Sequence, residues 1–126
     1  MDIPISINRE DRLSENQKLI KSFKDLKRNW YGHDEKPIPE EVIMVALGSI
    51  QHILVKPEVF PATDSSIQFD FNNFETFELE VNIEPKNIII YSSFENVENT
   101  SEIPNPENNP ELLADIINEY ITKYYS

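Results

Sequence analysis

Hydrophobic residues recur at two spacings along the chain, three or four residues apart near both ends and two residues apart in the middle. Residues 14–28 show the helical spacing and predict an amphipathic first helix. Ser14, followed three residues later by Gln17, has the form of a capping box at its start. The apolar positions of this segment are Leu19, Ile20, Phe23 and Leu26. Its outward face carries Lys18, Lys21, Lys24, Lys27 and Arg28.

A second segment with helical spacing follows two prolines. We expect this helix over residues 40–54, because two glutamates open it and a Lys-Pro pair follows it. Apolar residues cover more than half of its circumference, so it should lie buried between the sheet and another helix. Gly48 in its interior costs about 1 kcal/mol relative to alanine. We therefore interpret Gly48 as a point of close packing against a neighbour.

The period changes to two in the middle of the chain. Residues 67–71 and 77–83 alternate between apolar and polar side chains, which predicts two half-buried strands. With a three-residue loop over residues 72–74, Phe69 would face Phe77 across the hairpin, as Ile67 would face Leu79 one pair further on. Both apolar sets would then lie on one side of the hairpin.

The remaining segments predict one more strand and one more helix. After a turn signal at residues 84–87, residues 88–91 continue an antiparallel meander. Residues 94–109 are rich in Asn, Glu and Pro without a period, which predicts a long exposed acidic loop. Residues 110–124 show an apolar stripe behind Pro110 and predict a final helix. The expected fold is α+β in the order α-α-β-β-β-α, with a three-stranded antiparallel sheet packed on one face by helices.

Length and composition fit one domain over residues 1–126, with residues 1–12 as a flexible N-terminus. The chain has 126 residues, of which 39% are apolar and 27% charged, enough to bury one core. The absence of cysteine excludes disulfides, thiolate nucleophiles and Cys-ligated zinc, and favours a cytoplasmic location. Residues 1–10 lack the pattern of a signal peptide, and no run is long enough to span a bilayer, so we expect no membrane association.

Negative charge is concentrated in the later part of the chain. The net charge is −12, yet residues 1–36 carry 8 Lys and Arg against 7 Asp and Glu, whereas residues 37–126 carry 3 against 16. Such an imbalance creates a field that attracts basic surfaces and repels nucleic acid. Strand alternation places the polar residues of the predicted hairpin on the open face of the sheet. These residues are Gln68, Asp70, Glu78, Glu80 and Asn82, with Glu75 and Glu84 near the ends.

Residue patterns typical of common catalytic and metal sites are missing. The two histidines do not form an H-x-x-x-H or H-E-x-x-H motif, so we expect no metal site at His33, Asp34 and Glu35. His52 lies among apolar residues of the second predicted helix and is expected to serve packing. Two isolated glycines exclude a phosphate loop, and no acid–base pair of carboxylates is singled out. We therefore expect no cofactor and no enzymatic activity, and a pI near 4.5 argues against direct nucleic-acid binding.

The most distinctive local string surrounds the only tryptophan. The string Asn29-Trp30-Tyr31-Gly32-His33-Asp34 and the sequence after it resemble a group of small uncharacterised bacterial proteins with an N-W-D-G-Y-G-A-x-P-I segment, a helix, a Pro-rich crossing and a strand pair. The matching residues are Asn29, Trp30, Gly32, Pro37 and Ile38. The departures are Tyr31, His33, Asp34 and Glu35, so the second glycine of the pattern is absent. The resemblance covers about residues 29–90 and implies this architecture without implying an activity.

These observations favour a non-catalytic acidic protein that binds and inhibits a basic target, including targets that handle nucleic acid. Antitoxins, immunity proteins and phage counter-defence proteins are inhibitors of this kind. We expect charge complementarity from carboxylates and an aromatic anchor from the tryptophan loop. The expected contact residues are Asp70, Glu78 and Glu80 at the centre, Glu95, Glu98 and Glu102 at the rim, and Trp30 and Tyr31 as the anchor.

Two alternatives belong to other classes of protein. A small enzyme or ligand-binding domain would place its pocket beside residues 29–35, lined by Trp30 and His33. A homo-oligomeric module would pair through the edge formed by residues 88–91, which are apolar on both faces.

Overall fold

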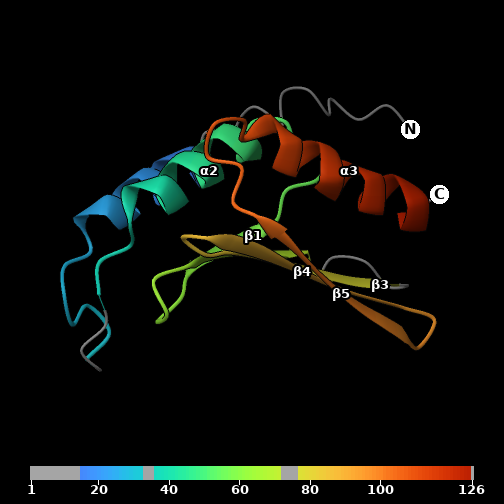
Figure 1. Ribbon diagram of the computed structural model, residues 1–126, viewed down its shortest axis with the longest axis horizontal. Coiled ribbons are helices and arrows are strands. Elements are labelled where there is room, and N and C mark those ends of the chain that lie inside the picture. Colours follow the sequence, from blue (N-terminus) through green and yellow to red (C-terminus); the bar gives the residue numbers. More distant parts are fainter. Residues whose placement is uncertain (1–14, 33–35, 72–76, 126) are drawn as a thin grey trace.

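A computed structural model describes residues 15–32, 36–71 and 77–125 of the protein. Across these residues, five antiparallel strands form one sheet, and helices lie on one of its faces (Figure 1). The order is α-α-β-β-β-β-β-α. The predicted α+β class is confirmed, whereas the three-stranded sheet is wrong because two further strands flank it. Residues 1–12 of the predicted flexible terminus lie outside the described part of the chain.

The sheet is a regular meander in which each strand pairs with the next one along the chain. Its order is β1-β2-β3-β4-β5, and every neighbouring pair is antiparallel. The strands are β1 (Glu58–Pro61), β2 (Ile67–Phe71), β3 (Phe77–Ile83), β4 (Asn87–Phe94) and β5 (Val97–Pro104).

The helical layer has three segments. The first is α-helical over the described residues 15–22 and ends in a single 3₁₀ turn, η1 (Phe23–Asp25), three residues before the predicted end at residue 28. The second is α2 (Glu40–Ile50) and the third is α3 (Glu111–Tyr125). No helix within the described residues is long and apolar enough to cross a bilayer.

Strand alternation directs one set of side chains into a core beneath the helices. Buried and less buried residues alternate through β2 and β3, and both apolar sets lie on one face, as expected. The register differs from the prediction, because Phe69 pairs with Val81 and Ile67 with Ile83. The predicted loop over residues 72–74 lies outside the described residues. Each predicted pair is displaced by four residues along β3, and an even displacement leaves the apolar side chains on the same face.

The predicted acidic loop over residues 94–109 is mostly strand β5. A two-residue turn at Glu95 and Asn96 joins β4 to β5, with backbone φ angles of 51° and 67°. Positive φ at both central residues is the geometry that matches the twist of a hairpin. The strand escaped prediction because β5 is an edge strand exposed along most of its length. It therefore has no strict alternation of apolar and polar residues.

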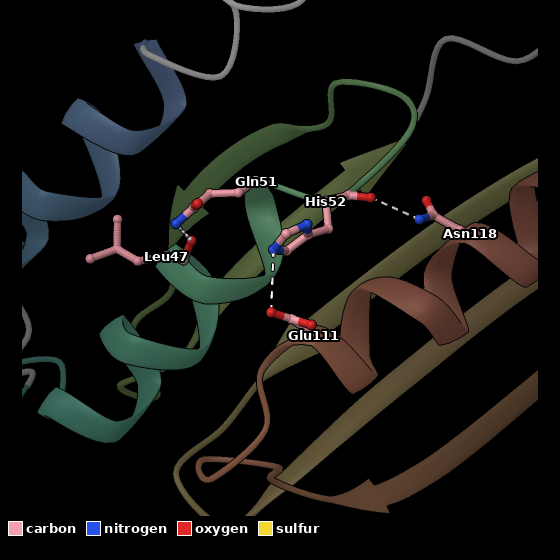
Figure 2. Close-up of polar contacts among 5 residues, drawn as sticks. All are labelled: Leu47, Gln51, His52, Glu111 and Asn118. Carbon is pink, nitrogen blue, oxygen red and sulfur yellow. Dashed lines mark hydrogen bonds and ion pairs between the residues drawn. The ribbon is translucent and has the colours of Figure 1, made fainter.

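The C-terminal end of α2 is tied to α3 by one amide side chain. Asn118 accepts a hydrogen bond from the Leu54 N–H at 2.9 Å. It also donates one to the His52 carbonyl at 2.8 Å (Figure 2). The helix ends at Ile50, four residues before the predicted end. His52 is exposed and its Nε2 lies 3.7 Å from Glu111 Oε1, so the expected packing role is wrong. The reason is that His52 follows the last helical turn.

Gly48 supplies a second contact between the same helices. A Cβ atom at this position would lie 2.5 Å from Cβ and 2.8 Å from Cγ of Pro110, just before α3. These distances are far below van der Waals contact, and a proline ring cannot rotate away. The predicted close approach at Gly48 is therefore confirmed, and its partner is Pro110.

We predict that Gly48→Ala destabilises the protein by about 1–3 kcal/mol through overpacking, although alanine favours a helix by about 1 kcal/mol. In a Pro110→Gly background the same substitution should become neutral or stabilising, because the ring that blocks the Cβ is gone. Urea unfolding of the four proteins of this cycle measures both effects. A stabilising Gly48→Ala in the native background would contradict the packing described here.

Candidate functional site

The face of the sheet opposite the helices carries a row of carboxylates across neighbouring strands. Glu58 on β1 pairs with Asp70 on β2, which pairs with Glu80 on β3. Glu80 pairs in turn with Tyr91 on β4, and Tyr91 with Thr100 on β5. Directly paired residues on adjacent strands point to the same face and hold their Cβ atoms about 4.5–5.5 Å apart. Three acids are therefore immediate neighbours.

Three further acids lie on this face. Glu78 and Glu98 each pair with Ser93 from opposite sides, and Glu102 pairs with Ile89. We call the six residues together the acidic face. It consists of Glu58, Asp70, Glu78, Glu80, Glu98 and Glu102. None of the five strands contains a lysine or an arginine.

An apolar and amide row runs beside the carboxylate row. Phe60 pairs with Gln68, Gln68 with Asn82, and Asn82 with Ile89. Phe60 is 40% exposed, and Ile89 is partly exposed. The acidic face thus offers a partner apolar contact area as well as charge, and interfaces of proteins combine the two in this way.

The two central carboxylates resist ionisation. Partial burial raises the pKa of Asp70, and the neighbouring Glu58 and Glu78 raise it further. Partial burial also raises the pKa of Glu80, with Asp70 and Glu78 adding to the effect. Both causes disfavour the charged form. The groups that act on each carboxylate are all acidic, so at neutral pH the folded protein holds mutually repelling charges at the centre of this face.

Tyr91 fixes the position of one acid on the neighbouring strand. Its hydroxyl donates a hydrogen bond of 2.7 Å to Glu98 Oε1. This hydrogen bond, with smaller effects of burial and of negative charge, raises the pKa of Tyr91. The contact orients Glu98 on the open face and joins β4 to β5 beyond the backbone ladder.

The structure brings together five of the eight predicted contact residues. Asp70, Glu78, Glu80, Glu98 and Glu102 share the acidic face, whereas Glu95 lies in the turn between β4 and β5. Glu58 was missed because its strand, β1, was not predicted; the Val59 and Phe60 pair beside it was the available signal. Glu75 lies outside the described residues.

Trp30 and Tyr31 do not belong to the sheet. They lie in the connection between the first helical segment and α2, where Trp30 Nε1 donates a 3.3 Å hydrogen bond to the Lys36 carbonyl. The two rings meet edge to face, with centroids 5.9 Å apart, and Tyr31 is 63% exposed. Gly32 provides the positive φ of 89° that the turn requires. The indole N–H thus bonds a backbone carbonyl of the same connection. His33, which was expected to line a pocket beside Trp30, lies outside the described residues.

The described acids do not assemble into a metal site. No group of three or more His, Asp or Glu side chains in residues 15–32, 36–71 and 77–125 is arranged to hold a metal ion. Residues 88–91 do not form the edge predicted for a homodimer. They belong to β4, which lies between β3 and β5 in the sheet. The prediction depended on residues 94–109 being a loop, which would have left β4 at the edge.

No protein-family model matches the sequence, and no curated protein and no solved structure shows significant similarity to it. The geometry of the acidic face is therefore the basis for inferring function.

We predict that the double variant Asp70→Asn, Glu80→Gln is more stable than the native protein at pH 7. Because both folded pKa values are raised, the native protein gains stability as pH falls through them towards the ordinary values of 3.8 and 4.5. The advantage of the variant should be about 0.2–1 kcal/mol at pH 7 and should disappear near pH 4. Urea unfolding at several pH values measures it.

The matched control is the double variant Asp115→Asn, Glu107→Gln, which removes the same two charges from exposed positions outside the sheet. It should leave stability at pH 7 nearly unchanged. An Asp70→Asn, Glu80→Gln variant that is less stable than the native protein at pH 7 would show that the two carboxylates are favourably paired.

Proposed function

We propose that this protein is a non-catalytic binding module whose acidic face captures a basic protein and inhibits it. The observation that carries the proposal is the gathering of six carboxylates on one uncovered sheet face whose strands contain no lysine or arginine. We further propose a cytoplasmic location, which the absence of cysteine favours.

Electrostatics favours a cationic partner at this face. A lysine or arginine placed beside Asp70 and Glu80 would relieve their repulsion and lower both pKa values. Binding would therefore release protons near the folded pKa values and would remove the cost that the free protein bears. Complementary charge also accelerates encounter, and this acceleration falls as salt screens the field over about 8–10 Å.

We propose inhibition because the acidic face would cover the basic surface with which a target binds its own ligand. A basic surface that binds phosphates would meet carboxylates in their place, and the partly exposed Phe60 and Ile89 would add apolar contact. Targets that handle nucleic acid carry surfaces of this kind. An antitoxin, an immunity protein and a phage counter-defence protein are the three biological forms that this proposal includes.

Capture of a partner from a lysate of the native host tests the proposal. We compare the native protein with the triple variant Asp70→Asn, Glu78→Gln, Glu80→Gln. The matched control is Asp115→Asn, Glu40→Gln, Glu107→Gln, which removes the same charge from exposed positions outside the sheet. We predict that a basic protein is retained at low salt by the native protein and the control, and is lost by the triple variant.

The same partner should be displaced as ionic strength rises, and it should lose its activity when the native protein is added. Thermal unfolding confirms that the triple variant is folded, which we expect because it relieves repulsion. Equal retention by the triple variant and the control would contradict a role for the acidic face.

A further inference from the structure

Among the described residues, β1 and β5 are the outer strands of the sheet, and their outward edges differ. Strand β1 has four residues and ends in Pro61. The Ala62 N–H bonds the Ser66 carbonyl at 2.8 Å, which marks this pair as hydrogen bonded. Because such pairs alternate along antiparallel strands, the outward positions of β1 are Val59 and Pro61. Proline has no N–H, so this edge presents one outward donor and is a poor template for another strand.

Strand β5 also ends in a proline at an outward position, Pro104, but unlike β1 it has three further outward positions before that proline. All eight of its residues pair with β4 in one continuous register. The Asn105 N–H bonds the Lys86 carbonyl at 2.8 Å, so alternation turns the N–H and C=O groups of Glu98, Thr100 and Glu102 away from β4. No proline, lysine or bulge interrupts these three positions. Proteins shield edges from strand addition with these features or with other charged side chains. The charges at this edge are those of Glu98 and Glu102, which an added strand of opposite charge would neutralise.

A strand added beside β5 would have one face towards α3 and the other on the open side of the sheet, and these two faces would contact different residues. On the helix side, β5 and α3 enclose a hollow of about 430 Å³, lined by Ser101, Ile103, Ile116 and Tyr120 among others. Ser101 Oγ lies 3.4 Å from the Tyr120 hydroxyl across this hollow. On the other side, Glu98 and Glu102 continue the acidic face up to the edge. Alternate side chains of an added strand would therefore face carboxylates on one side and, on the other, a hollow whose lining includes Asn99, Glu119 and Lys123 beside its apolar residues.

We propose that β5 binds an extended segment of a basic protein as a sixth strand, in which lysine or arginine alternates with apolar residues. The inference rests on the proposed function in one respect, namely that the partner is basic. The basic side chains lie beside Glu98 and Glu102, and the apolar ones enter the hollow against α3. A second copy of this chain fits less well, because pairing β5 with β5 would bring the glutamates of both copies together.

A short synthetic peptide in which lysine and valine alternate is the probe, and calorimetry measures its affinity. Thr100→Pro removes one outward N–H while leaving the bonds between β4 and β5, as Pro61 does on β1. We expect Thr100→Pro to weaken binding about tenfold. Thr100→Val keeps the N–H and should bind as the native protein does. Equal affinity of Thr100→Pro and Thr100→Val would overturn the proposal.

Changes to the peptide test the same point without altering the protein. A peptide N-methylated at alternate residues cannot form the new ladder and should lose binding. A peptide of equal composition with its lysines in one block should bind more weakly and should not distinguish Thr100→Pro from Thr100→Val. Equal affinity of the block and alternating peptides would overturn strand addition. So would a native dimer, seen by light scattering, that Thr100→Pro dissolves, because it would assign the edge to a second copy.

The two proposals fail separately. If the triple variant of Asp70, Glu78 and Glu80 loses the host partner while Thr100→Pro retains both partner and peptide, the acidic face stands and strand addition is wrong. If Thr100→Pro loses the peptide while the triple variant retains the host partner, strand addition stands and the proposed role of the acidic face is wrong.

Discussion

Burial of only one face of the sheet is the constraint on which the structure depends. Side chains of a strand alternate between the two faces, and helices α2 and α3 cover a single face (Figure 1). Every second residue of β2 and β3 is therefore apolar and buried, from Ile67 to Ile83. The residues between them lie on the face opposite the helices, and there the chain places its acids. One packing requirement thus creates the core and the acidic face together.

The two layers consequently differ in charge. The described helices carry both lysines and acids, whereas the strands carry acids without a single lysine or arginine. Such a face costs stability in the free protein, since burial and mutual repulsion both raise the pKa of Asp70 and Glu80. The cost is small for each pair, and it is offset by a core that includes the tight contact of Gly48 with Pro110. A basic partner would remove it.

The central strands and the central acids were predictable because alternation is strong where one face is buried. The close contact at Gly48 was likewise predictable, since glycine destabilises a helix interior and is usually found there where a neighbour packs closely. The sequence pattern failed at the edges, where β1 is short and β5 is exposed on both sides, so neither shows a clear period. Glu58 was not predicted as a contact residue because its strand, β1, was not predicted. The hairpin register was wrong by four residues because alternation fixes which face a side chain takes but not which residues pair across the strands.

Direct titration of the side-chain carboxyl groups by NMR is the measurement closest to the central claim. Chemical shifts of the carboxyl carbons report the pKa of each group in the folded protein. The account predicts that Asp70 and Glu80 titrate above their ordinary values of 3.8 and 4.5, and that each pKa falls when the other residue is replaced by its amide. Values at or below the ordinary ones would contradict the crowding of carboxylates around Asp70 and Glu80.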